Sequence, residues 1–173
     1  MTVDAPRVLV AGIGNVFLGD DGFGVEVVSR LRSRSLPGGV EVADYGIRGF
    51  DLAFSLLDAY DAVVIVDAVP RGGPPGTVRV LQPEFEPSTE AAQEERVVDS
   101  HGMNPMEVFR LVRKYGGTPP PTYLVGCEPA TTGPEEGCME LSPPVAAAVD
   151  EAVVLVESLV ERLAPSHRTA EGA

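Results

Sequence analysis

The stretch Val8-Leu9-Val10-Ala11-Gly12-Ile13-Gly14 decides the fold class. It is a continuous apolar run, too short for a helix and bounded by glycines, which is typical of a strand buried on both faces. Similar runs recur at residues 40–43, 62–69 and 122–127, and segments with helical spacing separate them. Strands that alternate with helices in this way form mostly parallel sheets. The sequence therefore predicts an α/β sandwich with a mostly parallel sheet.

One further strand is expected to run in the opposite direction. Residues 77–81 alternate the apolar Val78 and Val80 with polar neighbours. They follow the preceding strand too closely for the helical crossover that a parallel strand requires. We therefore expect one antiparallel strand in the sheet.

The segments between the strands have the spacing of helices. After Gly24, one helical face carries Val25, Val28 and Leu31, and a second, short helix is expected over residues 50–57. These two helices link the first three strands, as a parallel sheet requires.

Two later helices have clear starting signals. The sequence Asn104-Pro105-Met106-Glu107 places an Asn cap, a Pro at the first helical position and a Glu at the third, and this helix is expected to end near Lys114. The last helix starts after Ser142. Its single apolar stripe consists of Val145, Val149, Val153, Val156, Val160 and Leu163.

The composition fits one α/β domain over residues 1–163, followed by a flexible C-terminal tail at 164–173. The 173 residues include 26 acidic and 13 basic side chains, a net charge of −13. Such a charge argues against nucleic acid and against an anionic membrane surface as partners. Because no apolar stretch is long enough to span a bilayer and residues 1–6 lack the basic start and apolar run of a signal peptide, we expect a cytoplasmic protein.

Two other features favour ordinary structural roles. Cys127 and Cys138 are separated by ten residues and form no CxxC pair, so reduced thiols are expected. The segment 84–99 carries six acidic residues and one basic residue, which indicates a solvated loop.

The candidate functional residues lie where the predicted strands end. Asp20 and Asp21 follow the first strand, the second strand is expected to end in Asp44-Tyr45-Gly46, and Asp67 lies near the end of the third. His101 comes just before the capped helix, whereas His167 falls in the tail. Ligands of open α/β sheets bind at this carboxyl edge.

Each of these residues also has a structural alternative. Asp20 and Asp21 could favour a helix N-terminus through its dipole, and Asp44 could form a turn before Gly46. Serine or threonine hydroxyls could satisfy Asp67. Nucleotide binding is disfavoured, because the pair Gly12 and Gly14 lacks the third glycine of the dinucleotide motif.

Taken together, three strand-end carboxylates and one imidazole suit a divalent metal such as nickel, zinc or manganese. Three protein ligands would leave coordination positions open, as catalysis or recognition of a substrate-borne metal requires.

The order and spacing of several motifs resemble the maturation endopeptidases of nickel-iron hydrogenases. These motifs are Gly-Ile-Gly-Asn-x-x-x-Gly-Asp-Asp-Gly-x-Gly from Gly12, Val-Asp-Ala-Val from Val66, Ser-His-Gly around His101, and Gly-Cys-Glu-Pro from Gly126 followed by Glu-Leu-Ser-Pro. The resemblance runs from about Val8 to Leu163. It implies a three-layer α/β/α fold of the phosphorylase/hydrolase-like type.

The resemblance also implies a function and a site. Family members remove a short C-terminal extension from the hydrogenase large-subunit precursor after nickel insertion. The metal-contacting positions of the family fall on Asp21, Asp67 and His101, and the first of them is often Glu in relatives. Asp44 falls on a further family position, an Asp-x-Gly turn proposed to affect cleavage, and here Tyr45 and Ile47-Arg48 replace the small residues expected after it.

These residues suggest a water nucleophile, because no Ser-His-Asp or Cys-His order is visible. Either the metal activates the water or its target carbonyl, or one carboxylate acts as general base. We expect Asp21, Asp67 and Asp44 to serve catalysis, with nickel supplied by the precursor and bound weakly by the isolated enzyme. Two rival functions stay open: another peptidase on the same fold, and a non-catalytic nickel-sensing checkpoint or chaperone.

Overall fold

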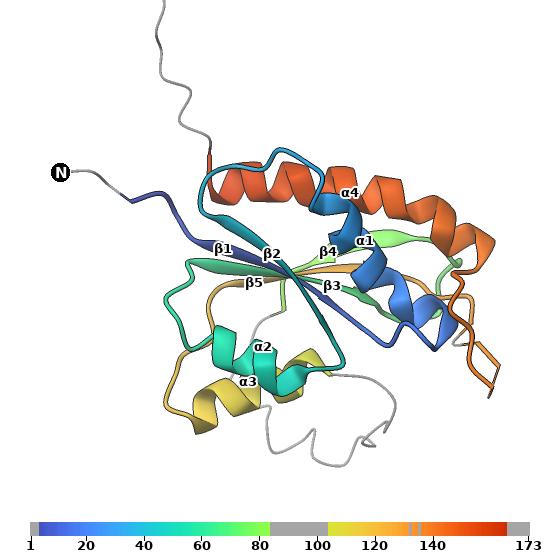
Figure 1. Cartoon of the computed structure of the whole chain (residues 1–173), viewed down its shortest axis with the longest axis horizontal. Coiled ribbons are helices and arrows are strands. Elements are labelled where there is room, and N and C mark those ends of the chain that lie inside the picture. The colour runs from blue at the N-terminus through green and yellow to red at the C-terminus, as the bar shows by residue number, and fades with distance from the viewer. Residues whose placement is uncertain (1–3, 84–103, 132, 135, 166–173) are drawn as a thin grey trace, which may run out of the picture.

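The computed structural model in Figure 1 describes residues 4–83, 104–131, 133–134 and 136–165. Its centre is a five-stranded sheet with the strand order β2-β1-β3-β5-β4. The strand β4 pairs antiparallel with β5, and the other neighbours are parallel. The strands are β1 (Val8–Ile13), β2 (Val40–Gly46), β3 (Ala62–Ala68), β4 (Val78–Leu81) and β5 (Thr122–Cys127).

Helices cover both faces of this sheet. On one face lie α1 (Phe23–Leu31) and α4 (Pro143–Leu163), and on the other lie α2 (Gly49–Ser55) and α3 (Pro105–Lys114), as Figure 1 shows. A short 3-10 helix, η1 (Gly19–Gly22), precedes α1. The predicted sandwich, its mostly parallel sheet and its antiparallel strand are confirmed, in the three-layer form that the family resemblance implies.

The two faces of the sheet bury separate hydrophobic cores. Val8 and Val10 of β1 point toward α1 and α4, whereas Leu9 and Ala11 point toward α2 and α3. All residues of β1 are buried. The strand is therefore a continuous apolar run, because alternate residues must fill two cores.

The later helices match their sequence signals. The Asn104 side chain accepts a hydrogen bond of 2.9 Å from the backbone N–H of Met106 at the start of α3. The predicted stripe of α4 is buried from Val145 to Val160, and Leu163 is half-buried.

The second strand was expected to end in Asp44-Tyr45-Gly46 and does so, although its pairing with β1 shifts register after Asp44. Two other element predictions need correction. Residues 50–57 were expected to be helical, but α2 ends at Ser55 and a turn follows. In α1 the buried face contains Val27, whereas Val25 is half-buried, since Phe23 begins the helix and sets its face.

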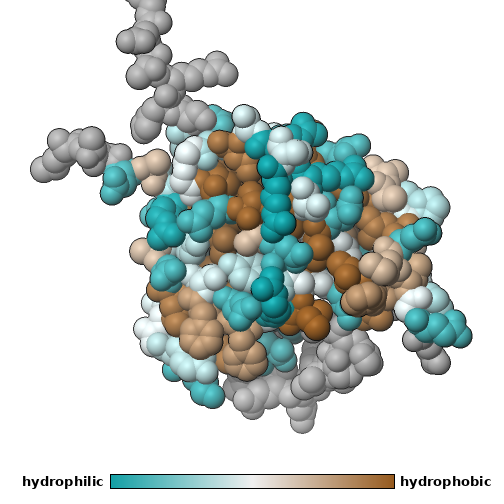
Figure 2. All heavy atoms as spheres, in the orientation of Figure 1, coloured by the Kyte–Doolittle hydropathy of each residue, from teal (hydrophilic) through white to brown (hydrophobic). Residues whose placement is uncertain are grey.

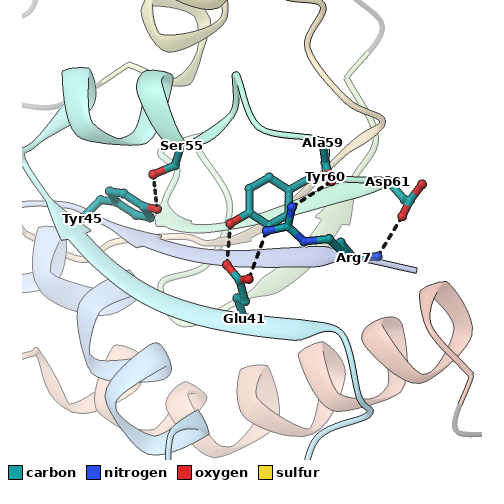
Figure 3. Close-up of polar contacts among 7 residues, drawn as sticks. All are labelled: Arg7, Glu41, Tyr45, Ser55, Ala59, Tyr60 and Asp61. Carbon is teal, nitrogen blue, oxygen red and sulfur yellow. Dashed lines mark hydrogen bonds and ion pairs between the residues drawn. The ribbon is translucent and has the colours of Figure 1, made fainter. Parts of the chain in front are cut away.

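The amino edge of the sheet is closed by a polar cluster, which Figure 3 shows. The Arg7 guanidinium lies 4.6 Å from the centroid of the Tyr60 ring and 3.2 Å from Glu41. The Tyr60 hydroxyl donates to the same carboxylate, and the backbone N–H of Arg7 donates to Asp61. These contacts tie β2 to the segments that lead into β1 and β3.

Some predictions fall outside the described residues. These are the acidic loop at 84–99, His101, and the part of the tail at 166–173. Among the helices that the structure describes, none has the length and apolar character needed to cross a membrane.

Candidate active site

The predicted carboxylates meet at the carboxyl edge of three neighbouring parallel strands. In the sheet β1 lies between β2 and β3, with Gly12 paired to Asp44 on one side and to Val66 on the other. Asp67 therefore comes one residue after the paired position on β3. Asp21 belongs to η1, which follows β1.

Asp67 and Asp21 interact electrostatically. Burial raises the pKa of Asp67 well above its usual value, and the negative charge of Asp21 raises it further. The backbone N–H of Ala68 opposes this shift by hydrogen bonding. Because each carboxylate disfavours the charge of the other, the pair is suited to share a proton or to hold a cation.

A hydrogen bond and a close backbone contact hold Asp21 in place. Its Oδ2 accepts a hydrogen bond of 2.7 Å from the backbone N–H of Asn15. A Cβ at Gly14, whose φ is +125°, would lie 1.9 Å from the carbonyl oxygen of Asp21. A side chain at Gly14 would therefore displace this residue.

Another glycine of the same motif brings α1 against the sheet. A Cβ at Gly24 would lie 2.0 Å from the carbonyl oxygen of Val66 and 2.5 Å from that of Ile13. Gly24 is thus needed for the close approach of α1 to β1 and β3. These glycines of the motif serve packing around the carboxylates.

Asp20 has a different role from its neighbour, and sequence reasoning missed it. The residue is 0% exposed. Its carboxylate accepts four hydrogen bonds: one each from the backbone N–H groups of Ala130, Thr131 and Ser142, and one from the Ser142 hydroxyl, at 2.7–3.0 Å. Although burial alone raises the pKa of Asp20, the donors from Ser142, Thr131 and Ala130 prevail and lower it.

Asp20 therefore clamps the first loop to the segment between β5 and α4. Further backbone hydrogen bonds join these two segments, with Gly19 N–H donating to the Cys138 carbonyl and Cys138 N–H donating to that of Phe17, both at 2.7 Å. Asp20 does lie in the first turn of η1, but its carboxylate accepts hydrogen bonds from the segment between β5 and α4. The signal that could have revealed the clamp is the Ser in the Glu-Leu-Ser-Pro motif.

Asp44 lies near the end of β2 at the same edge, before a turn that larger residues hold. The Arg48 guanidinium donates to the carbonyl of Asp44 and, at 3.3 Å, to that of Tyr45. The Tyr45 hydroxyl donates to Ser55 of α2 at 2.8 Å (Figure 3). Gly46 adopts a φ of +52°, so a turn does follow Asp44. The neighbouring charge that raises the pKa of Asp67 is that of Asp21.

The third predicted metal ligand, His101, lies outside the described residues. Within the parts of the chain that the structure describes, no group of three His, Cys, Asp or Glu side chains could hold a metal ion. The structure thus brings Asp21 and Asp67 together, while the imidazole stays a prediction.

The cysteines are free thiols, as predicted. Cys127 is buried at the end of β5, and burial raises its pKa to about 11. A thiol that stays protonated at neutral pH is a poor nucleophile. The described site therefore relies on carboxylates.

Known proteins share this sequence and this fold. The family model for hydrogenase maturation proteases matches residues 25–159. The chain is 33% identical to the hydrogenase expression/formation protein HupD of Rhodobacter capsulatus over 148 residues, which are 85% of this chain and 68% of that protein. It is 32% identical to the hydrogenase 2 maturation protease of Escherichia coli K12 over 149 residues, which are 85% and 86% of the two chains.

Solved structures agree with these relatives. The hydrogenase maturating endopeptidase HybD from E. coli superposes with a TM-score of 0.71 at 28% identity, covering 90% of this chain and 93% of that one. The [NiFe] hydrogenase maturation protease HycI from Thermococcus kodakarensis KOD1 gives 0.62 at 28% identity, with 93% and 94% covered. The chain belongs to the hydrogenase maturation protease family.

Proposed function

We propose that this protein is the endopeptidase that removes the C-terminal extension of the nickel-loaded large-subunit precursor of a nickel-iron hydrogenase. Family membership supports the reaction class, because relatives are named as hydrogenase maturation proteases. The observation that carries the proposal is the pair of Asp21 and Asp67, in which burial and the charge of Asp21 together raise the pKa of Asp67. A cation between two such carboxylates would relieve their repulsion.

In this proposal the nickel ion arrives as part of the substrate. Asp21 and Asp67 supply oxygen ligands and His101 supplies an imidazole nitrogen, a mixed set that suits nickel. Since the precursor provides most of the ligands, the isolated protein is expected to bind the metal weakly. Cleavage then depends on whether the precursor has been loaded.

The nucleophile that we propose is a water molecule. Its oxygen attacks the carbonyl carbon of the scissile peptide, while Asp21 or Asp67 accepts its proton. The proton then passes to the departing amine as the C–N bond breaks. We assign Asp44 to the same machinery, because its strand ends beside β1 at this edge. The alternative is that nickel accelerates the cleavage by activating the water or the scissile carbonyl.

The direct test incubates the purified protein with nickel-loaded precursor and follows release of the C-terminal peptide by mass spectrometry. We expect release from the loaded precursor and none from nickel-free precursor. Asp67→Asn and His101→Ala should abolish release without unfolding the protein. Asp150→Asn, an exposed carboxylate on α4, should cleave like the wild type. Equal cleavage of both precursors would refute the nickel-sensing part of the proposal.

The same experiment separates the rival functions. A non-catalytic checkpoint or chaperone would bind the loaded precursor in stoichiometric amount without releasing peptide. A peptidase with another substrate would instead hydrolyse small peptides in the absence of a hydrogenase precursor. We place the reaction in the cytoplasm, which the two free cysteines support.

A further inference from the structure

A cluster of exposed apolar side chains lies on α2 and the end of α3. The exposed fractions are 63% for Ile47, 61% for Phe50, 53% for Phe54, 38% for Leu57 and 48% for Tyr115. We call these five residues the α2 face. Figure 2 shows hydrophobic side chains on the surface over these helices. Scattered apolar residues are normal on a protein surface, but a contiguous group marks an interaction site.

The helical spacing of α2 explains why these side chains gather. Phe50 and Phe54 are four residues apart and so lie on one side of α2, and Leu57 follows in the turn after Ser55. The opposite side, with Leu52 and Leu56, is buried in the core. The segment thus exposes an apolar face although its other face already anchors it to the sheet.

Contacts with α3 hold this face in shape. The rings of Phe54 and Tyr115 are stacked, with their centroids 5.3 Å apart. A Cβ at Gly117 would lie 2.6 Å from a methyl carbon of Leu57, so the backbone after α3 passes close to that side chain. The face is therefore preorganised, which lowers the entropic cost of binding.

The α2 face is continuous with the candidate site. It begins at Ile47, directly after Gly46, where β2 ends. Arg48 donates to the carbonyls of Asp44 and Tyr45 and so ties the start of α2 to the site turn. From Phe50 to Phe54 the face follows α2 for ~6 Å at the helical rise per residue.

The charge around this face permits contact with a protein partner. Residues 47–58 and 104–117 contain four basic and three acidic side chains, whereas the whole chain has a net charge of −13. An apolar partner with an acidic rim would therefore meet no net repulsion here. On the other side of the sheet, α4 exposes the large apolar side chain of Val154, at 56%.

We propose that the α2 face docks the folded body of the hydrogenase large-subunit precursor through an apolar patch on that partner. The C-terminal extension then reaches around the edge to Asp21 and Asp67. This inference rests on the proposed function, because it takes the precursor as the partner. In this inference the α2 face provides the affinity for the precursor, and Asp21 and Asp67 carry out the cleavage.

The test uses the full chain with Phe50→Ser and Phe54→Ser combined. Cleavage of nickel-loaded precursor should show a KM at least ~10-fold higher with kcat unchanged, the pattern of lost uniform binding. Binding to the precursor, measured by biolayer interferometry in an Asp67→Asn background, should weaken by the same factor. Val154→Ser is the matched control and should change neither quantity. Circular dichroism checks that each variant folds, and the single variant Phe50→Glu provides a second probe with the same expectation.

The outcomes separate this inference from the proposed function. If the wild type neither cuts nor binds the precursor, the proposed function itself fails. If the wild type cuts but the double variant and Phe50→Glu keep the wild-type KM and affinity, the docking inference is wrong. If the substitutions instead convert a dimer of this chain into a monomer without changing precursor binding, the α2 face binds a second copy and the inference is also wrong.

Discussion

Replacing Asp20 with Asn should destabilise the protein by about 4 kcal/mol. Oδ2 of Asp20 accepts hydrogen bonds from Ala130, Thr131 and the Ser142 hydroxyl, and Oδ1 accepts one from the Ser142 backbone N–H. In the variant, the side-chain amide is most stable when its oxygen takes the position of Oδ2, because three of the four donors point there. Its NH₂ group then faces the Ser142 N–H, so a charge-assisted bond worth roughly 1.5–3 kcal/mol is lost and a buried donor costing about 1–3 kcal/mol is left unpaired.

Urea unfolding followed by circular dichroism measures this loss, and a thermal scan should show a fall of about 8–16 °C in Tm for a chain of this size. Asp150→Asn is the control, because this carboxylate pairs with Arg30 at 2.7 Å while its side chain is 77% exposed. An exposed pair of this kind contributes at most about 1 kcal/mol. If the Asp20 variant lost no more stability than the Asp150 variant, the clamp would not hold these segments together.

The clamp also predicts a pH dependence. The pKa of Asp20 is lower in the folded protein than in the unfolded chain, because the donors outweigh the effect of burial. Its contribution is therefore fully present above the unfolded pKa of about 3.9 and is lost as the pH falls through the folded value. The difference in unfolding free energy between wild type and Asp20→Asn should narrow on acidification below about pH 4. A constant difference would contradict the assigned ionisation.

Two further predictions concern the edge of the sheet. Gly24→Ala should cost about 3 kcal/mol in urea unfolding, because its Cβ would meet the Val66 carbonyl at 2.0 Å. Gly38→Ala, where nothing lies within 4 Å of the added carbon, should change stability by less than about 0.5 kcal/mol. Asp67→Asn should abolish cleavage yet raise stability, and this gain should grow from pH 5 to pH 8 in urea titrations. Burial and the charge of Asp21 raise the folded pKa of Asp67, so the wild type loses stability as the pH rises toward that value; equal gains at both pH values would contradict this.

The sequence predicts those parts of the fold that a short stretch of residues determines by itself. The strand β1 fills two cores and must be apolar throughout, so its pattern was visible. The start of α3 depends on Asn104 and Pro105, which act within one turn. The carboxyl edge was predictable as well, because parallel strands bring Asp21 and Asp67 to one side once their order is given.

The parts that sequence could not predict depend on distant partners. The register of β2 against β1 shifts between Gly12 and Ile13, which residues 40–46 alone do not reveal. The turn after Asp44 is held by Arg48 and Tyr45, whereas the family resemblance led us to expect small residues there. The clamp at Asp20 joins residues that are 110 to 122 positions apart in the sequence.

The adjacent carboxylates Asp20 and Asp21 show how one short helix produces two chemical roles. In a 3-10 helix successive side chains are rotated by ~120°, so neighbours cannot face the same surroundings. Asp20 meets backbone and hydroxyl donors, which lower its pKa and keep it charged. Asp21 meets the buried Asp67 and contributes to the rise of its pKa. Because the charge of Asp20 is already satisfied inside the protein, a cation that enters the site would be drawn to the pair whose repulsion it can relieve. The clamp thus fixes the position of Asp21 without competing for the ion that Asp21 and Asp67 are proposed to bind.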